Sequence, residues 1–470
     1  MTKWFKVELD KPALSYKVGE PIKFKVYAMQ DLGKISLSCL KWQLTTDDGQ
    51  NEWGYSSTTP SNPFEVETTL SRPGFARLHI DAMTDDVALI PDFTPLDASA
   101  GAEVEKIPYA DEIPEDFDEY WAKIEKDIAD HEVKFLRKTP YGKPVPEGYD
   151  CYNVRISTPY DTVASGCISI PKDAAEKSCS IRMAFMGYGV AGAAPSFAPN
   201  TIYVVMNAHG IDNQDEITRA ETWNKNKHLL NYGFNEKDNE NPDTCYWKNM
   251  AVRNLCALKI AKALPQWDGE HIIAAGGSQG ALQATTVAAH SEEVTLLDLS
   301  VPWFCNIAAE TKGYLQGWRP KFKEGLRYFD TVAQGTRVKC PVKIFAGLGD
   351  YCCPPHSTMA LYNNIKTQKS IRYLQQRTHG VNPPFLPEEF ELRCGFEEDT
   401  NEIKLGKYRH YKGGEYEVIG FARHSETEEQ MVVYRALYGE GETWTRPASM
   451  WFDVVIHDYK LVTRFTYIGE

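Results

Sequence analysis

The chain has 470 residues, of which 42% are hydrophobic, and it carries a formal net charge of −14 at pH 7. A chain of this length exceeds the usual size of a single core, so we expect two or three domains. The acidic balance argues against nucleic acid as a partner, because phosphate-binding surfaces are basic. The longest apolar runs are far shorter than the roughly 18–20 residues that span a bilayer, which argues against a membrane protein.

The amino-terminal stretch has no long apolar segment and no small-residue cleavage site, so the given chain shows no secretory signal. We expect a cytoplasmic protein, or a secreted one if a leader has been removed. The 11 cysteines include no C-x-x-C pair, which favours reduced, buried thiols over disulfides. The adjacent Cys352 and Cys353 suit a tetrahedral zinc site poorly, and we expect no His or Cys cluster around them. We therefore expect neither a metal nor a cofactor.

Residues 3–90 alternate apolar and polar side chains in short runs that are separated by Gly, Pro and Asp turns. This pattern predicts a small antiparallel β-sandwich over residues 1–100. The turns at 18–21 and 72–74, with Trp42 between them, resemble an immunoglobulin-like accessory domain. The Cys…Trp…Cys pattern of antibody domains is absent, so the resemblance is one of architecture.

A different pattern begins near residue 110 with a segment that has acidic residues in the first turn of an expected helix. Apolar strands then alternate with helical stretches, which is typical of a parallel α/β sheet. This pattern predicts an α/β catalytic domain over residues 110–387. The expected strands are 181–186, 202–206, 271–275, 342–346 and 370–374, and the expected helices are 249–263 and 281–289.

A proline-rich stretch at 382–387 indicates a linker, and strand-like runs follow it at 415–420 and 431–434. We therefore expect a small β-rich domain over residues 404–470.

The string Gly-Gly-Ser-Gln-Gly at 276–280 matches the G-x-S-x-G motif of a catalytic serine on a sharp turn. The motif alone is weak evidence, because roughly 0.1–0.2 chance matches are expected in a chain of this length. Its context strengthens it, since an apolar strand precedes it and a helical run follows it. The sequence therefore makes Ser278 a candidate nucleophile.

A serine hydroxyl needs a histidine base and a carboxylate that orients it, in the chain order Ser…Asp/Glu…His. Asp350 follows an apolar strand with a glycine-rich exit, and His379 follows the next short strand. Other residues compete for these roles. The rival acids are Asp330 and Asp298, and the rival histidines are His356, which lies too close to Asp350 in the chain, and His290, which ends the helix after Ser278.

An oxyanion intermediate needs two backbone N–H donors, one of them from the residue after the nucleophile. Gln279 supplies the first. The loop Gly187-Tyr188-Gly189 follows an earlier strand, so the Tyr188 N–H is the second candidate. The alternative interpretation is an ordinary glycine turn.

Together these motifs resemble the acetyl xylan esterase and cephalosporin-C deacetylase family of α/β-hydrolases. The matching strings are 186–189, 277–280, 347–350 with Cys-Pro-Pro at 353–355, and His379. The resemblance implies an α/β-hydrolase core with a Ser278–His379–Asp350 triad and an oxyanion hole from Tyr188 and Gln279. The chain departs from the family at 204–210, where Arg-Gly-Gln is usual, and at Gly380, where Glu is usual. Xylan specificity is therefore not carried over.

The C-terminal segment resembles a family of short bacterial proteins without an assigned activity, through the strings 406–413, 422–427, 433–439 and 444–447. Its interleaved arginines and aromatic residues suit a stacking surface for a sugar, nucleotide or peptide. The alternative is a small barrel whose tyrosines fill the core.

Our leading hypothesis is a serine carboxylester hydrolase that removes small acyl groups, above all acetyl, from a carbohydrate or related small molecule. The alternatives are a serine peptidase on the same fold and a non-catalytic carbohydrate-binding or scaffold protein. The resemblance also suggests a homo-oligomer.

Overall fold

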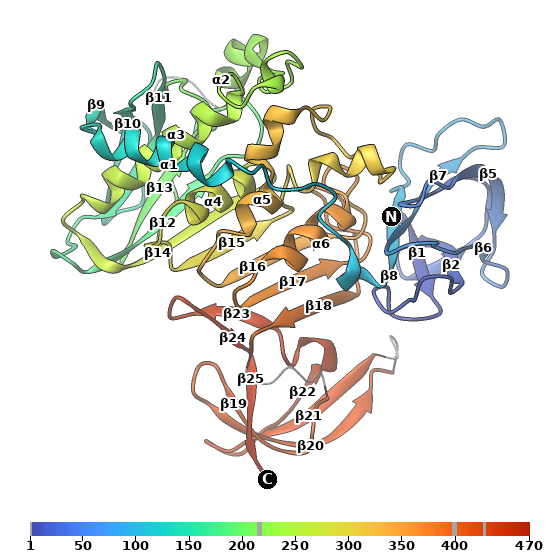
Figure 1. The fold of residues 1–470 in the computed structure, drawn as a ribbon. Coiled ribbons are helices and arrows are strands. Elements are labelled where there is room, and N and C mark those ends of the chain that lie inside the picture. Colours follow the sequence, from blue (N-terminus) through green and yellow to red (C-terminus); the bar gives the residue numbers. More distant parts are fainter. Residues whose placement is uncertain (1, 214–218, 397–401, 426–428) are drawn as a thin grey trace.

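The computed structural model describes residues 2–213, 219–396, 402–425 and 429–470. Figure 1 shows three units: an N-terminal β unit in blue, a central unit built on one large sheet, and a C-terminal β unit in red.

The N-terminal unit consists of two antiparallel four-stranded sheets. One contains β1 (Lys3–Leu9), β2 (Ile22–Gln30), β3 (Gly33–Ile35) and β6 (Phe64–Thr68), and the other contains β4 (Leu37–Thr46), β5 (Asn51–Thr58), β7 (Gly74–Met83) and β8 (Leu96–Ala102). Side chains from both sheets share one hydrophobic core, which includes Phe24 and Leu78. The alternating pattern thus folds into strands, whereas the immunoglobulin-like character of this unit stays a prediction.

The central sheet has ten strands in the order β18-β17-β16-β15-β14-β12-β13-β11-β10-β9. The strands from β12 to β17 pair in parallel, and the strands at both edges are antiparallel. Their bounds are β9 (Phe135–Pro140), β10 (Tyr149–Ser157), β11 (Val163–Pro171), β12 (Cys179–Phe185), β13 (Thr201–Met206), β14 (Trp267–Gly277), β15 (Leu296–Ser300), β16 (Val342–Gly347), β17 (Lys369–Leu374) and β18 (Glu389–Cys394).

This sheet differs from the sequence expectation in two respects. It is mixed rather than parallel, and it extends past the expected boundary at 387, because β18 adds to its edge. The sequence did not reveal β18 because its residues are only half-buried and show no clear alternation. The proline-rich stretch before β18 is therefore a connection within the sheet rather than a linker between domains.

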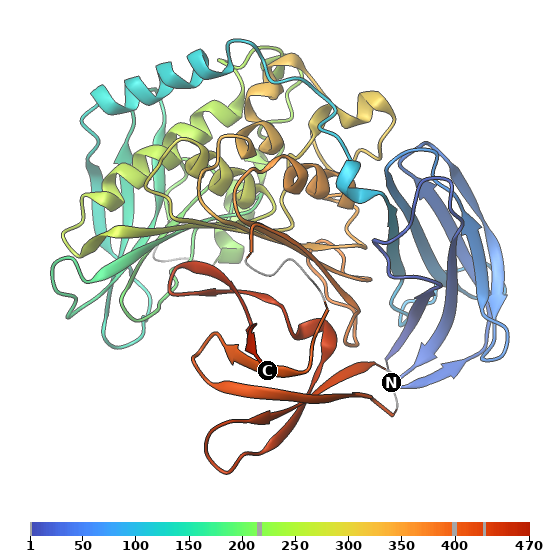
Figure 2. The same cartoon turned by 60° about the horizontal axis from the view of Figure 1, so that its bottom comes forward.

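Helices cover one face of the sheet, as Figure 2 shows. They are α1 (Phe117–Asp130), α3 (Tyr246–Lys262), α4 (Gln279–Ala289), α5 (Thr331–Gly335) and α6 (Pro355–Asn364), and α2 (Arg219–Asn226) lies farther out. Short 3-10 turns occur at Val104–Lys106, Lys227–Leu229, Asp238–Glu240, Ile307–Lys312, Glu324–Phe329 and Ala448–Met450. Among the helices in the described part of the chain, none is both long enough and apolar enough to cross a membrane.

The C-terminal unit is a five-stranded antiparallel sheet with a separate hairpin. The sheet contains β19 (Gly406–His410), β20 (Glu415–Arg423), β21 (Gln430–Ala436), β22 (Thr443–Pro447) and β25 (Phe465–Gly469), and the hairpin consists of β23 (Val454–His457) and β24 (Lys460–Thr463). Tyr408 and Tyr434 are buried around Trp451 and Phe465, whose rings stack at 4.0 Å. Two tyrosines thus fill this core, while Trp444 remains exposed on β22.

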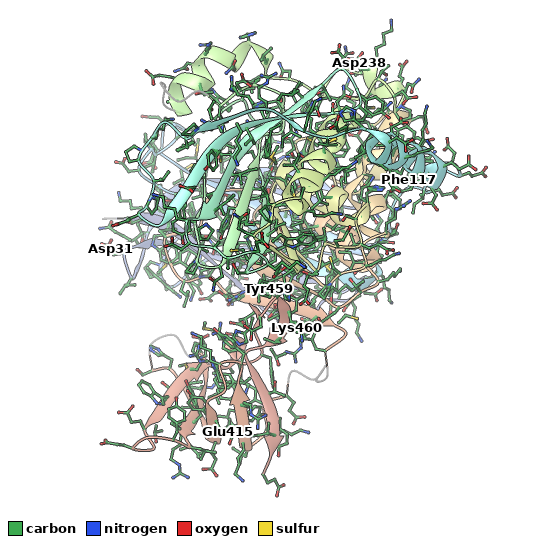
Figure 3. The ribbon with its side chains drawn as sticks, turned by 90° about the vertical axis from the view of Figure 1, so that its left-hand side faces the viewer. Asp31, Phe117, Asp238, Glu415, Tyr459 and Lys460 are labelled. Atoms are coloured by element: carbon green, nitrogen blue, oxygen red, sulfur yellow. The ribbon has the colours of Figure 1, made fainter. Side chains whose placement is uncertain are left out.

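The hairpin β23–β24 packs on the sheet face opposite the helices (Figure 2). Val454 and Leu461 are buried there against Ile273 of β14 and Leu296 of β15. The Tyr459 ring stacks on His271 at 4.0 Å, and Figure 3 shows Tyr459 at the junction between the two units. The C-terminal unit is therefore docked on the back of the strand that leads to Ser278.

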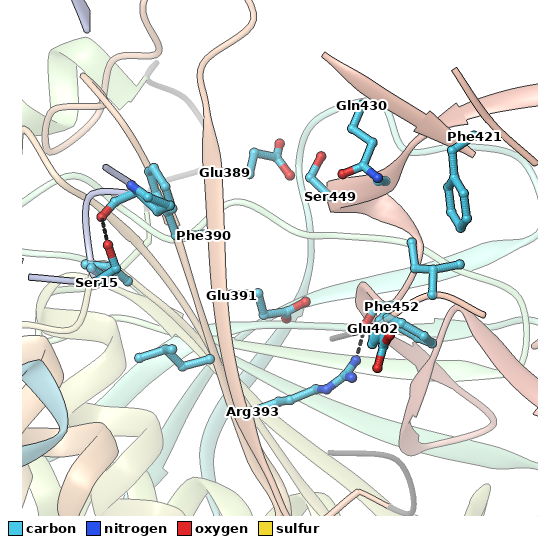
Figure 4. Close-up of a pocket in the computed structure, with 15 residues that line it drawn as sticks. Ser15, Glu389, Phe390, Glu391, Arg393, Glu402, Phe421, Gln430, Ser449 and Phe452 are labelled. Atoms are coloured by element: carbon cyan, nitrogen blue, oxygen red, sulfur yellow. Dashed lines mark hydrogen bonds between the residues drawn. The ribbon is translucent and has the colours of Figure 1, made fainter. Parts of the chain in front are cut away.

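A cavity of about 840 Å³ lies between β18, the N-terminal unit and the C-terminal sheet. Figure 4 shows Phe390 on the side of Ser15, whereas Glu391 and Arg393 lie on the side of the C-terminal unit. Glu391 Oε2 accepts the Val454 N–H at 3.0 Å, but the buried Oε1 has no partner.

We expect Glu391→Gln to reduce the dependence of stability on pH. Burial raises the pKa of Glu391 from 4.5 to about 7, and the nearby Asp453 adds to this effect although the Val454 N–H opposes it. The folded protein therefore holds this proton more tightly than the unfolded chain does. The resulting stabilisation is fully present below pH 4.5 and is lost as the pH rises through about 7. Its upper bound is about 3 kcal/mol.

Urea unfolding between about pH 5 and pH 8 measures this effect. The free energy of unfolding should fall less steeply in Glu391→Gln than in the wild type. The control Glu440→Gln, at an exposed position, should keep the wild-type slope. Equal slopes in all three proteins would contradict the prediction.

Candidate active site

Ser278 lies at the sharp turn between β14 and α4, with φ 54° and ψ −124°. Such backbone strain is rare for a residue with a side chain and is concentrated at functional sites. The flanking glycines permit the turn. A Cβ at Gly276 would lie 2.1 Å from the carbonyl oxygen of Gly280, and a Cβ at Gly280 would lie 2.2 Å from that of Phe185. The local sequence thus folds as the G-x-S-x-G motif requires.

Loops after two neighbouring strands bring an acid and a base to this serine. Asp350 follows β16, and His379 follows β17. His379 Nε2 lies 3.0 Å from Ser278 Oγ, and His379 Nδ1 lies 2.9 Å from Asp350 Oδ2. The three side chains form one hydrogen-bonded series with the geometry of a serine hydrolase triad.

The Asp350 carboxylate is held in one orientation. It is 1% exposed, and its Oδ1 accepts the N–H groups of Cys352 and Cys353 at 2.8 Å each. Oδ2 is therefore directed at His379. This arrangement fixes the imidazole with Nδ1 toward the acid and Nε2 toward the serine.

The pKa of His379 lies above its ordinary value. Burial by itself lowers this pKa, but the hydrogen bond and charge of Asp350, with the Cys352 thiol, raise it by more. Asp350 thus stabilises the charged imidazole, which is the form that His379 takes once it has accepted a proton from the serine hydroxyl. The His379 side chain is 33% exposed, so a substrate can reach the ring.

The expectation that no His or Cys cluster surrounds the adjacent cysteines is wrong. Among the residues that the structure describes, Cys352, Cys353 and His379 are the one group with metal-ligating potential, and their ligand atoms lie within 4.8 Å of one another. The pKa of the Cys352 thiol is lowered, because Cys353 and His379 hydrogen-bond to it. Burial raises the pKa of the Cys353 thiol. The sequence did not reveal this group because His379 lies on a different loop.

The rival acids have other partners. Asp298 forms an ion pair with Arg182 at 2.6 Å. Asp330 is fully buried and caps α5, and burial raises its pKa to about 6. Its carboxylate accepts three backbone N–H groups, from Asn306, Ile307 and Val332. Asp330 is therefore a structural carboxylate that holds two chain segments together.

The rival histidines are likewise bound elsewhere. The His356 ring is buried, with Nδ1 3.1 Å from Asp47 of the N-terminal unit. The His290 ring lies between Glu125 and Gln334, at 2.6 and 2.7 Å. Each ring therefore connects two structural elements and does not contact Ser278.

Tyr188 and Gln279, the residues predicted to form the oxyanion hole, belong to two segments that meet at the serine turn, because a Cβ at Gly187 would lie 3.6 Å from the Gly277 carbonyl oxygen. Gln279 is the first residue of α4, where the helix offers its N–H no acceptor. Tyr188 lies in the loop after β12. The Tyr232 hydroxyl donates to Gln279 Oε1 at 2.9 Å, and its ring stacks on Tyr188 at 4.4 Å. This placement supports the predicted role, which stays a prediction.

Partly exposed aromatic rings flank the Tyr188 loop. Trp318 is 40% exposed, and its ring meets that of Tyr188 edge-on at 4.7 Å. The backbone N–H of Trp318 donates to the Cys352 carbonyl at 3.0 Å, which ties this residue to the loop that carries Asp350. Trp223 of α2 is 38% exposed and packs against Gly189, where a Cβ would lie 2.6 Å from the ring. Flat apolar surfaces thus border the site.

The N-terminal unit holds the loop that carries Asp350. Ser99 Oγ of β8 donates to the Leu348 carbonyl at 2.5 Å. The Arg77 guanidinium of β7 lies 3.3 Å from the centre of the Tyr351 ring. Because Leu348 and Tyr351 lie before and after Asp350 in the chain, the two contacts fix the loop on both sides of the acid.

The same unit also holds the loop that leads to His379. Gln375 Nε2 donates to the Ser99 carbonyl at 2.9 Å, and Gln375 Oε1 accepts the Ser99 N–H at 3.3 Å. Gln376 accepts the Val7 N–H at 3.1 Å and donates to the Phe5 carbonyl at 2.8 Å. The N-terminal unit therefore holds both the loop that carries Asp350 and the loop that carries His379.

The family model of acetyl xylan esterases matches residues 101–313 and 319–393, which is more than half of the chain. The chain belongs to the acetyl xylan esterase family. The matched region of this family member contains Ser278, Asp350 and His379 and starts after most of the N-terminal unit. A second model, described as a protein of unknown function, matches residues 406–467.

Several known proteins resemble this acetyl xylan esterase family member. The acetyl esterase Axe7A of Xylanibacter ruminicola is 28% identical over 282 residues, which cover 54% of this chain and 61% of that relative. An acetyl xylan esterase structure from Paenibacillus sp. R4 is 17% identical, with a TM-score of 0.49, and covers 60% of this chain and 94% of its own. A Bordetella bronchiseptica protein of the second family is 38% identical, with a TM-score of 0.14, over 14% of this chain and 90% of its own.

Sequence reasoning missed the residues that support the site in this family member. Ser99, Gln375 and Gln376 act across units that lie far apart in the chain, and no local pattern marks such contacts. Tyr232, which connects the two predicted oxyanion residues, follows no motif. The one available signal was the pair Cys352-Cys353, which follows Asp350 after a single residue.

Proposed function

We propose that the protein is a serine carboxylester hydrolase that removes acetyl groups from an acetylated carbohydrate. The observation that carries this proposal is the hydrogen-bonded series from Ser278 through His379 to Asp350, in a chain of the acetyl xylan esterase family.

In this mechanism Ser278 Oγ attacks the acyl carbon while His379 Nε2 takes its proton. His379 then protonates the leaving alkoxide, and an acyl group remains on the serine. Water, deprotonated by the same imidazole, attacks this ester and releases acetate. Asp350 keeps the imidazole in the working tautomer and stabilises its charged form. The negative oxygen of each tetrahedral intermediate lies toward the N–H groups of Tyr188 and Gln279.

The carbohydrate part of the proposal rests on the surface beside the triad. Trp318 and Trp223 offer partly exposed indole faces, and aromatic faces pack well against the C–H face of a sugar ring. The relative from Xylanibacter ruminicola carries the name acetyl esterase, which agrees with a small acyl group.

A substrate panel tests this function. Acetate release from acetylated xylo-oligosaccharides and acetylated monosaccharides should exceed turnover of cephalosporin C, and aminoacyl-naphthylamides should not be cleaved. Trp318→Ala should raise KM for the acetylated oligosaccharide more than for p-nitrophenyl acetate, which has no sugar to stack.

Two outcomes would overturn the proposal. Cleavage of the naphthylamides without release of acetate would favour the peptidase alternative. A fluorophosphonate probe that labels no serine, together with inactivity on the whole panel, would favour the non-catalytic binding or scaffold alternative.

A further inference from the structure

Two thiols and the imidazole of the triad meet beside Ser278. Cys352 is half-buried and Cys353 is buried, and they follow Asp350 two and three positions along the chain. Because Asp350 Oδ1 accepts both of their N–H groups, the backbone curls tightly around the carboxylate. Their sulfur atoms and a ring nitrogen of His379 all lie within 4.8 Å of one another.

Adjacent cysteines alone suit a zinc site poorly, but His379 from a second loop completes a set of three donors for a thiophilic cation. Zn²⁺ binds two cysteine sulfurs and one histidine nitrogen with bonds of roughly 2.3 and 2.0 Å, which leaves a fourth position for water or another oxygen. The ligand atoms of such an ion lie about 3.5–4 Å apart, so the three atoms, which lie within 4.8 Å of one another here, need to draw only slightly closer.

We propose that Cys352, Cys353 and His379 form a binding site for Zn²⁺ and that its occupation switches off hydrolysis. The ion displaces the two thiol protons to solvent and takes the lone pair of His379 Nε2. Ser278 Oγ, which lies 3.0 Å from that nitrogen, then loses its base and occupies or faces the fourth position of the metal.

The effect on hydrolysis rests on the proposed function, whereas binding of the ion does not. Two measurements separate them, both on the full-length protein with its thiols kept reduced. The first is inhibition of p-nitrophenyl acetate hydrolysis by Zn²⁺, with recovery after addition of EDTA. The second is the absorption of Co²⁺ bound to the Ser278→Ala protein, which needs no activity.

In the first measurement, Cys352→Ser should raise the Zn²⁺ concentration for half-inhibition by at least about 10-fold, relative to its own metal-free rate. The control Cys394→Ser removes an exposed thiol on β18 and should leave the inhibition unchanged. Equal inhibition of wild type and Cys352→Ser would overturn the proposal.

In the second measurement, one equivalent of Co²⁺ should give a thiolate-to-metal charge-transfer band that Cys353→Ser weakens. Binding without such a band would overturn the site. A wild type that hydrolyses no ester but shows the band in Ser278→Ala would refute the proposed function and uphold the metal site. An active enzyme without the band would refute the metal site and uphold the proposed function.

Discussion

Ser278→Ala is expected to lower kcat for p-nitrophenyl acetate by up to about 10⁶-fold, on the precedent of a serine protease whose nucleophile was removed. The loss is large because no other hydroxyl lies in reach of His379 Nε2 among the contacts of the described site. The fold should be retained, since the Ser278 N–H bonds to the Ser300 carbonyl whatever its side chain is.

Ser300→Ala is the matched control, because only its backbone carbonyl supports the serine turn. It should keep near wild-type turnover and fluorophosphonate labelling, and Ser278→Ala should lose both. If Ser278→Ala hydrolyses the ester as fast as the wild type, the nucleophile has been misidentified.

Asp350→Asn tests the acid independently of the nucleophile. Asparagine can still accept the N–H groups of Cys352 and Cys353, so the loop should keep its shape. Its amide favours the wrong imidazole tautomer at His379, which should lower turnover by up to about 10⁴-fold. The loss should fall on kcat more than on KM, because the interaction strengthens as the imidazole becomes charged.

Asp330→Asn should have the opposite profile. It weakens a buried carboxylate with three backbone donors, which should lower the melting temperature while turnover per folded molecule stays close to wild type. Activity that survives in Asp350→Asn but disappears in folded Asp330→Asn would show that the acid has been assigned to the wrong residue.

The features that the sequence predicted well are local ones. The turn at 276–280 lies between β14 and α4 because glycine spacing and flanking apolar runs encode it over a short stretch. Asp350 and His379 were found because parallel strands deliver their carboxyl-terminal loops to one edge, and the structure brings both side chains to Ser278. The family was found on the same strings and is confirmed by the family model.

The features that the sequence did not predict depend on contacts between distant segments. The half-buried strand β18 has no period of its own and is defined by its pairing with β17. The hairpin β23–β24 looked like part of a separate domain, yet it is buried on β14 and β15. The approach of His379 to the two cysteines depends on how two loops fold over each other.

The bonds between the N-terminal strands and the two loops make the N-terminal unit part of the site's framework. Leu348, Gln375 and Gln376 each have a polar group whose partner is a hydroxyl or peptide group of those strands. Without the strands these groups would turn to solvent, and the loops that carry Asp350 and His379 would lose the bonds that hold them. The catalytic domain cut out by itself is therefore expected to position its acid and base less firmly than the full chain does.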